Sequence, residues 1–364
     1  MHDLPAAVSA TPVAPTRRTG PLALSGLLLI AVLTILHLAR EVVLPVVAAL
    51  ILSLVFLPAV RGMKKLYIPA SLGAGVIVLG LLAGFLIGVY TLAAPARDWL
   101  DKAPQALREV GNKLSYFTGQ VSHVSKATAK VRDVTDDMTG NGQARAAEVT
   151  VNTSTRAGDI LDGARVFSLS AASTLLLLFF LLASGDLFLR KTIAATPLLA
   201  DKRRAVDIAK QVESAVSHYL FAVTLINIAL GAAVALALSL LGVPNPLLWG
   251  VMVAVLNFVP YLGEITIVVA LTLVGLLTFD DVWRGLAVPG IFCVLSAAER
   301  YLITPTVVGH QLSLNPVVIV LSVLFWGAMW GIAGALLAVP ILVTLKVLCD
   351  RIERLKVFGE FLGE

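Results

Sequence analysis

Three charged residues lie inside or beside long apolar stretches of this chain, and they are its first candidates for chemistry. Glu264 directly follows Pro260-Tyr261-Leu262-Gly263, and Glu299 and Arg300 are neighbours further along. A charge at membrane depth is costly, so such a residue usually pairs with another group or lines a pathway. Glu264 could therefore bind a proton or a cation, accept hydrogen bonds from a polyol, or pair with a basic residue. Adjacent residues on a helix do not face each other, so we expect Glu299 and Arg300 to be structural charges near a helix end.

Neutral polar residues and helix-weakening residues lie near Glu264 in the sequence and at the start of the next apolar run. Asn257, Tyr261 and Gln311 suit a small hydroxylated ligand, although Tyr261 could equally anchor the chain at a membrane interface. We predict that the substrate or ion pathway is formed by Asn257, Pro260, Tyr261, Gly263, Glu264, Gln311, Asn315 and Pro316.

Sequence signatures of catalysis and of metal binding are missing. The chain has no HExxH, GxxxxGK[ST] or GxSxG motif, and its five histidines have no metal-ligand spacing. Cys293 and Cys349 cannot form a CxxC metal site. We therefore predict that the protein is not an enzyme and has no cofactor or bound metal. Without an ATPase motif, transport would draw its energy from a gradient or from the substrate itself.

The composition identifies an all-α integral membrane protein. Of 364 residues 58% are hydrophobic and 14% are charged, and the mean hydropathy is +0.90. A soluble globular protein is less apolar and more charged than this. The net charge of +5 is expected to orient the chain in the bilayer, with basic segments in the cytoplasm, and we predict no binding of nucleic acid.

Charge and apolar length divide the chain into seven stretches, with about eight hydrophobic segments that are either six spans plus two re-entrant hairpins or eight spans. We expect Arg40 and Glu41 to form a tight turn between the first two spans, and both termini to be cytoplasmic. The predicted stretches are a disordered cytoplasmic tail (1–20), transmembrane segments one to three (21–96), an extracytoplasmic amphipathic helical insert (97–165), transmembrane segment four (166–185), a basic cytoplasmic linker (186–212), a transport core with two broken or re-entrant segments (213–348) and a cytoplasmic tail (349–364).

The insert carries charges of both signs and a thin apolar seam. Between Leu100 and Met138 the apolar residues recur at spacings of three and four, which is typical of a helix that packs lengthwise on another helix. A break at Thr139–Gly142 would allow a helical hairpin. The seam needs a partner helix from the same or a neighbouring subunit, and the alternative is a helix that lies on the membrane.

Two apolar runs in the core each begin at an Asn-Pro pair and are interrupted near their middle. The first, 246–279, contains Pro260 and Gly263, and the second, 315–346, contains Gly327, Gly331 and Gly334. Such breaks predict re-entrant hairpins, in which polar backbone is tolerated only inside protein or beside a wet cavity. The positive-inside rule places the two hairpins on opposite faces, as an inverted repeat. Two kinked spanning helices are the alternative.

The same region resembles a known family in an ordered set of motifs. These are Pro244-Asn245-Pro246-Leu247-Leu248-Trp249-Gly250, Leu256-Asn257-Phe258-Val259-Pro260-Tyr261-Leu262-Gly263, Thr304-Pro305-Thr306-Val307-Val308-Gly309, Leu314-Asn315-Pro316-Val317-Val318 and Gly331-Ile332-Ala333-Gly334-Ala335-Leu336-Leu337-Ala338-Val339-Pro340. Together they resemble the autoinducer-2 exporter family, strongly over 210–350 and more loosely before it. The resemblance implies a transporter of the bacterial inner membrane that exports the furanosyl signal autoinducer-2 or exchanges sodium for protons. It also implies a homo-oligomer, with a pentamer as one form.

Residues and resemblance together predict a secondary transporter that exports a small polar metabolite, with autoinducer-2, a quorum-sensing signal, as one candidate. A sodium–proton antiporter that uses Glu264 is the alternative, because the family pattern has a small residue or Pro at that position. A non-transporting scaffold whose insert recruits partners is the alternative from another class. The expected partners are the lipid bilayer, a small polar solute or a monovalent cation, and further copies of the chain.

Overall fold

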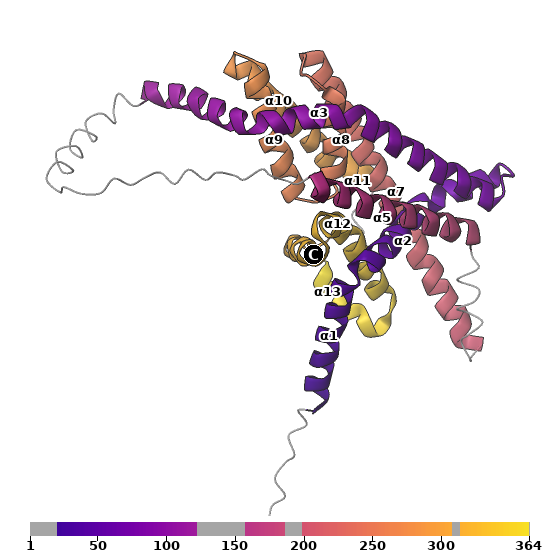
Figure 1. The fold of residues 1–364 in the computed structure, drawn as a ribbon. Helices are drawn as coiled ribbons and strands as arrows, with labels where there is room; N and C mark the ends of the chain where they lie inside the picture. The colour runs from indigo at the N-terminus through magenta and orange to yellow at the C-terminus, as the bar shows by residue number, and fades with distance from the viewer. Residues whose placement is uncertain (1–19, 122–156, 186–198, 308–313, 364) are drawn as a thin grey trace, which may run out of the picture.

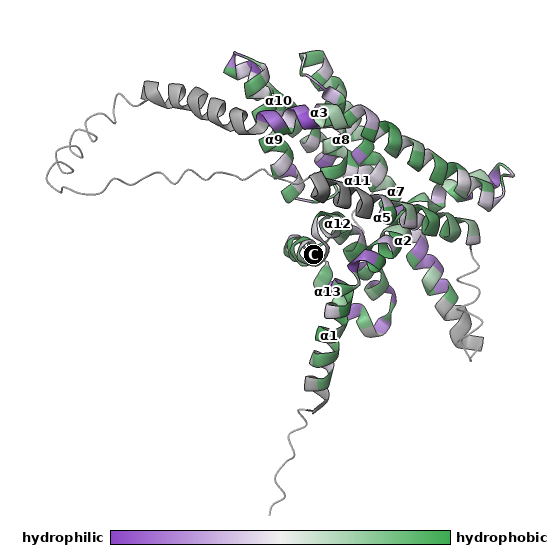
Figure 2. Ribbon diagram, viewed as in Figure 1, coloured by the Kyte–Doolittle hydropathy of each residue, from purple (hydrophilic) through white to green (hydrophobic). Residues whose placement is uncertain are grey.

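The computed structural model describes residues 20–121, 157–185, 199–307 and 314–363, and this part of the chain is helical without a β-strand (Figure 1). An isolated bridge joins Leu314 to Gly363. Hydrophobic residues predominate along most of the helices, and hydrophilic residues gather in a few short stretches (Figure 2). Within these residues, the helical segments long and apolar enough to cross a membrane are Arg40–Lys65, Ala70–Lys102, Val206–Leu241, Val282–Val307 and Pro316–Arg351. The prediction of an all-α integral membrane protein is thereby confirmed.

The first two helices follow each other nearly end to end. Helix α1 (Gly20–Leu38) and helix α2 (Arg40–Lys65) are separated only by Ala39. Helical hydrogen bonds pass through this residue, because its N–H donates to Ile35 and its carbonyl accepts from Val43. The predicted tight turn at Arg40–Glu41 is therefore wrong, and α2 leads on from α1 rather than folding back alongside it (Figure 1). The cytoplasmic N terminus depended on that turn and stays a prediction.

The third helix is longer than one membrane crossing. Helix α3 (Ala70–Val121) continues without interruption from the predicted third span into the predicted insert. Its first part packs with α2 and with α5 (Ala157–Ser184) around Ala49, Ala74 and Leu178. Further along, the ring of Trp99 meets that of Trp249 edge to face at 5.2 Å. The rest of the predicted seam and the break at 139–142 lie outside the residues whose side chains are described.

Helix α7 (Leu199–Leu241) packs against two groups of the remaining helices. Near its N-terminal end, Val216 and Leu220 are buried against α2 and α12. Near its C-terminal end, Leu230, Val234 and Leu238 are buried against helices α8 to α10. Burial of apolar side chains on both halves of α7 makes it the common wall of two groups of helices.

The first interrupted run of the core forms two short helices, α8 (Pro246–Leu256) and α9 (Leu262–Thr278). Pro246 stands at the first helical position of α8, where its missing N–H costs nothing. The α8 backbone packs closely on α7, because Gly231 and Gly250 face each other without a Cβ between them. Its length of 11 residues, at about 1.5 Å each, is well short of a 30 Å bilayer core.

Helix α10 (Val282–Ala298) returns along α9 and ends in an irregular segment. The carboxylate of Asp281 caps its start by accepting from the N–H groups of Trp283 and Arg284. At its end the chain widens into one π-helical turn, η1 (Glu299–Ile303), followed by the short α11 (Thr304–Val307). Single π-helical turns often occur at functional sites, because they redirect side chains.

The second interrupted run is helical on both sides of Gly331 and folds back on itself at this residue. Helix α12 (Pro316–Arg351) has non-helical dihedrals at Gly331, with φ 67° and ψ −146°, a region open only to glycine. The Ser322 hydroxyl donates to the Ala338 carbonyl at 3.3 Å, whereas a straight helix would separate these residues by about 24 Å. The two halves of α12 are therefore the arms of a hairpin.

The short C-terminal elements pack against the second arm of α12. These are η2 (Glu353–Leu355) and α13 (Lys356–Leu362). The buried Lys346 donates to the Asp350 carboxylate at 2.9 Å and to the Gly359 carbonyl at 3.2 Å. The N–H of Asn315 donates to the Leu362 carbonyl at 3.1 Å. Both ends of the second hairpin are therefore tied to the same segment.

The two hairpins open at opposite ends of α7. Arg284, at the start of α10, donates to the Leu241 carbonyl at 3.4 Å, so the first hairpin opens at the C-terminal end of α7. Arg351, at the end of α12, donates to the Gln211 side chain at 2.7 Å, so the second opens at the N-terminal end. The 30 residues between Gln211 and Leu241 span about 45 Å of helix.

Candidate functional site

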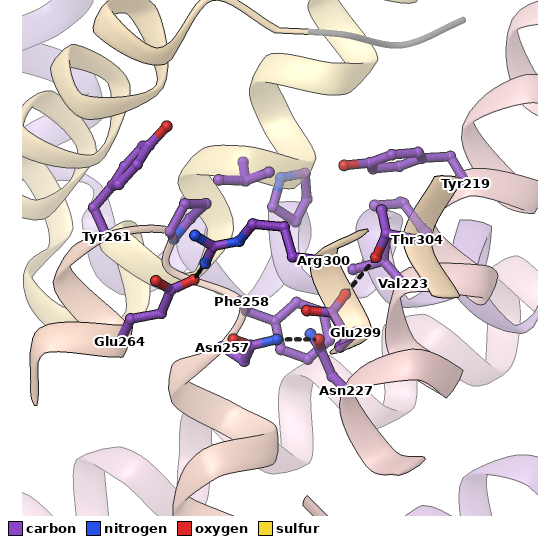
Figure 3. A pocket seen from close by; sticks show the side chains of 14 residues that line it. Tyr219, Val223, Asn227, Asn257, Phe258, Tyr261, Glu264, Glu299, Arg300 and Thr304 are labelled. Carbon is purple, nitrogen blue, oxygen red and sulfur yellow. Dashed lines mark hydrogen bonds and ion pairs between the residues drawn. The ribbon is translucent and has the colours of Figure 1, made fainter. Parts of the chain in front are cut away.

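A polar cavity of about 280 Å³ lies where the tip of the first hairpin meets the middle of α7 and the end of α10 (Figure 3). Val259 of this tip packs on Val323 and Ala338 in the two arms of α12, so the tip touches the second hairpin as well. The cavity is lined by Tyr219, Leu220, Val223, Asn227, Asn257, Phe258, Pro260, Tyr261, Glu264, Glu299, Arg300, Thr304, Val339 and Pro340.

The tip itself is a tight turn held in an unusual backbone conformation. Tyr261 has φ 63° and ψ −60°, and the N–H of Leu262 donates to the Pro260 carbonyl at 2.7 Å. This is a γ-turn with positive φ, which is rare and strained for a residue with a side chain. Gly263 follows with its Cα against the end of α8, where an added Cβ would lie 1.9 Å from the Leu256 carbonyl oxygen. Strain at this turn is stored next to the cavity.

An ion pair links the hairpin tip to the end of α10. Arg300 donates from Nη2 to Oε1 of Glu264, and both side chains keep contact with solvent at 47% and 27% exposure. The π-helical turn that contains Arg300 directs its guanidinium to this tip (Figure 3). Because an exposed ion pair contributes little to stability, this pair can break and re-form at small cost.

Glu299 and Thr304 form a second polar contact on the wall of the cavity. The Thr304 hydroxyl donates to Oε1 of Glu299 across the π-helical turn. Glu299 and Arg300 are neighbours in sequence, and both line the cavity because they belong to the widened turn. They were predicted to be structural charges near a helix end, and the structure places them in the lining of the same cavity as Asn257, Tyr261 and Glu264.

Two asparagines form the third polar contact of the cavity. Nδ2 of Asn257 donates to Oδ1 of Asn227 at 2.8 Å. Asn227 is only 2% exposed, and its own Nδ2 has no hydrogen-bond partner. A buried donor without an acceptor costs about 1–3 kcal/mol. Asn227 lines the cavity, and its buried Nδ2 could donate to a ligand oxygen if the side chain turned toward the cavity.

The structure brings some of the predicted pathway residues together and leaves others apart. Asn257, Pro260, Tyr261 and Glu264 line the cavity. Gly263 belongs to the tip of the first hairpin, beside the cavity. Asn315 and Pro316 lie instead at the open end of the second hairpin, where the Asn315 side chain accepts from the Val317 N–H at 2.9 Å and caps α12. Gln311 lies outside the described residues.

Three polar residues of the cavity were not among the site residues predicted from the sequence. Tyr219 and Asn227 lie on α7, and Thr304 follows the π-helical turn. Asn227 did leave a signal, because it is an amide in the charge-free run between Ser214 and Leu241. Thr304 stands in one of the family motifs but was given no role there, since its approach to Glu299 depends on the widening of the turn.

Two broken segments that open at opposite ends of α7, with a cavity at the tip of the first, are an arrangement found in membrane transporters. The sequence is in agreement. Residues 27–354 match the model of the AI-2E family of transporters, and the chain belongs to this family.

Curated relatives cover most of the chain at low identity. YhhT of Escherichia coli K12 is 26% identical over 325 residues, which is 88% of this chain and 87% of that protein. The AI-2 transport protein TqsA of the same strain is 23% identical over 329 residues, 89% of this chain and 90% of TqsA. YueF of Bacillus subtilis is 24% identical over 322 residues, 85% and 84% of the two chains. The protein is thus a multi-pass membrane protein of a bacterial transporter family.

Proposed function

We propose that the protein is a secondary transporter of the bacterial inner membrane that exports a small polar metabolite through the cavity at the tip of the first hairpin. The observation that carries this proposal is the convergence on one cavity of a strained turn, an ion pair and a buried amide without a partner. In transporters with broken helices, the binding site lies near the bilayer midplane, where the helices are interrupted.

The chemistry of the lining favours an oxygen-rich solute. Arg300 and Asn227 offer donors, whereas Glu264 and Glu299 offer acceptors, so a molecule with several hydroxyl or carbonyl groups could satisfy both kinds. The cavity volume of about 280 Å³ lies at the small end of ligand pockets. The name of the relative TqsA makes autoinducer-2 the first solute to test.

The ion pair gives the hairpin tip two states. With Glu264 bound to Arg300, the tip is joined to the end of α10, and with the pair broken both charges can turn to the solute. A solute hydroxyl can accept from Arg300 and donate to Glu264, so binding replaces the contact that it breaks. Alternation between these states, with the hairpins opening on opposite faces, would carry solute across the membrane.

The orientation and assembly of the protein follow as further parts of the proposal. Arg61, Lys64, Lys65 and Arg351 lie at the end of the bundle where α7 begins, and the positive-inside rule puts this end in the cytoplasm. The C terminus then lies on that side, the second hairpin enters from the cytoplasm, and the first from outside. We expect a homo-oligomer, with a pentamer as one form, as the family resemblance implies.

Sodium–proton exchange through Glu264 is less favoured than solute export. A guanidinium already occupies the Glu264 carboxylate, and a monovalent cation would have to displace it against charge repulsion. Among the described residues there is no group of three or more acidic, histidine or cysteine side chains that could hold a metal ion.

Flux measurements in proteoliposomes test the proposal. The purified protein is reconstituted, and the efflux of labelled autoinducer-2 and of a panel of furanoses, polyols and amino acids is compared with sodium-driven proton movement in the same vesicles. We expect efflux of at least one hydroxylated solute and no sodium dependence of the internal pH. Exchange of sodium for protons without solute efflux would support the antiporter, and folded protein without any flux would support the scaffold.

A further inference from the structure

A second cavity, of about 480 Å³, lies between α2, α7 and the second arm of α12. Its lining is mostly apolar, and the α7 face consists of Ile208, Ala209, Val212 and Val216 with Glu213 among them. Leu54 of α2 and Leu348 of α12 close the other sides. The solute cavity shares none of these residues, so this is a separate site.

Two arginines flank this apolar cavity. Arg61, at the end of α2, pairs with the lining residue Glu213 and remains 47% exposed. Arg351 directly precedes the lining residue Ile352 and donates to Gln211, the neighbour of the lining residue Val212. A guanidinium has five N–H donors, and each of these arginines is shown with a single acceptor, so both can bind a further anion. Lys64 and Lys65 are exposed at the same end of α2.

The lining is apolar apart from Glu213, which pairs with Arg61, and Thr344, whose hydroxyl donates to the Pro340 carbonyl, so most of the cavity offers no polar partners for water. In a bilayer the apolar material at hand is the acyl chain of a lipid. The cavity lies at the basic end of three candidate membrane spans, where the charged headgroups of a leaflet would meet the arginines. Basic pockets between membrane helices bind anionic headgroups in this way.

We propose that this cavity is a binding site for one anionic phospholipid, with an acyl chain between α2, α7 and α12 and the phosphate between Arg61 and Arg351. Glu213 and Glu353, which directly follows Ile352, offset the charges of the two arginines, and the exposed Lys64 and Lys65 leave an excess of positive charge that selects an anionic over a zwitterionic lipid. This site goes beyond transport and does not depend on which solute crosses the membrane.

The C-terminal segment stabilises the part of α12 that lines the site. Lys346 donates to Asp350 and to the Gly359 carbonyl, which fixes the turn of helix that carries Leu348. A lipid in the cavity would then join the outgoing arm of the second hairpin to α2 and α7. Its role is to hold this hairpin in place while the first hairpin moves.

Lipid titration of the delipidated protein by native mass spectrometry tests the proposal. Phosphatidylglycerol and phosphatidylcholine with the same acyl chains are compared, and inorganic phosphate serves as the headgroup alone. We expect phosphatidylglycerol to bind about tenfold more tightly, because both lipids carry the phosphate but only phosphatidylcholine carries a choline cation, which the basic rim repels. Arg351→Gln should remove that preference, whereas Arg40→Gln, at the other end of α2, should keep it. Phosphate alone should not bind.

The acyl-chain part of the site has its own test. Ala209→Phe fills the cavity and should abolish tight binding of phosphatidylglycerol, with the melting temperature as the check on folding. A phosphatidylglycerol with a diazirine on its acyl chain should crosslink to peptides that contain 208–216 and 344–352. Equal binding of both lipids to the unmodified protein, an unchanged preference in Arg351→Gln, or crosslinks confined to other peptides would overturn the proposal. If Ala209→Phe does not fold, Arg351→Gln and the crosslinks decide.

Discussion

The first hairpin of the core breaks over Asn257–Tyr261 and presents a carboxylate near its tip, whereas the second breaks at Gly331 and ends in aromatic side chains. Both breaks contain a residue with positive φ. In the first, that residue is Tyr261, whose side chain makes the conformation strained. In the second it is glycine, which adopts the same sign of φ without strain. Two backbones that turn in a similar way therefore store different amounts of free energy.

The two hairpin tips also differ in the contacts that hold them in place. Trp330 at the second tip donates from Nε1 to the Leu36 carbonyl at 3.2 Å, and Nδ1 of His37 lies 3.1 Å from the Met329 carbonyl oxygen. The second tip is thus anchored to the end of α1 by hydrogen bonds to backbone carbonyls. The first tip is held through an exposed ion pair beside a cavity. We infer that the first hairpin moves during transport and the second supports it.

The largest expected effect of a substitution is on flux through the first hairpin. Glu264→Gln keeps the shape of the side chain and removes its charge, which leaves Arg300 without its partner. We expect solute efflux to fall by about ten- to a hundredfold, the contribution of one hydrogen bond to a charged group. The matched change in the second hairpin, Ser322→Ala, removes a hydroxyl that contacts a carbonyl and should leave efflux nearly unchanged.

Glu264 and Arg300, the two residues of the ion pair, should affect efflux as one unit. If they do, Arg300→Gln lowers efflux as much as Glu264→Gln, and the double variant is no worse than either alone. Efflux in proteoliposomes, normalised to folded protein, gives the coupling. Additive losses in the double variant would mean that the two charges act separately, and unchanged efflux in Glu264→Gln would remove the first hairpin from the pathway.

Much of this comparison could be predicted from the sequence, because helix breaks are local. Pro260, Gly263 and Gly331 mark the turns by their own backbone properties, and the apolar runs on either side set the arm lengths. The ion pair could not be predicted, since Glu264 and Arg300 approach each other only through the packing of α9 on α10 and the widening of a helical turn. The turn expected at Arg40–Glu41 failed for the opposite reason: two charges interrupt an apolar run without interrupting its helix.

A third prediction concerns the close packing of the arms of each hairpin. An alanine Cβ at Gly263 would lie 1.9 Å from the Leu256 carbonyl oxygen, and one at Gly334 would lie 2.0 Å from the Trp326 carbonyl oxygen. Both substitutions should lower the free energy of unfolding by about 1–3 kcal/mol through overpacking, measured by thermal melting. Gly84→Ala is the control, because nothing lies within 4 Å of an added Cβ there. Efflux per folded molecule should fall further in Gly263→Ala than in Gly334→Ala, and equal losses would contradict the distinction between the hairpins.

The smallest expected effect is at the anchored tip. Trp330→Phe keeps a ring in place but removes the Nε1 donor to Leu36. Loss of this hydrogen bond should cost about 0.5–1.5 kcal/mol of stability, seen as a lower melting temperature, with efflux per folded molecule unchanged. Trp283→Phe, at an exposed site at the start of α10, should change neither. A loss of efflux in Trp330→Phe as large as that in Glu264→Gln would show that the second tip moves too.

The most direct test of the cavity as the transport pathway uses one cysteine at Thr304, in a protein whose Cys293 and Cys349 have been replaced by alanine. Thr304→Cys is nearly isosteric and lines the cavity, and Thr266→Cys, on α9 with its hydroxyl bonded to the Leu262 carbonyl, is the control outside it. A small thiol reagent is applied, and labelling and solute efflux are followed together. We predict that modification at 304 blocks efflux, that the transported solute slows this modification, and that neither holds at 266. Full efflux after complete modification at 304 would contradict the account.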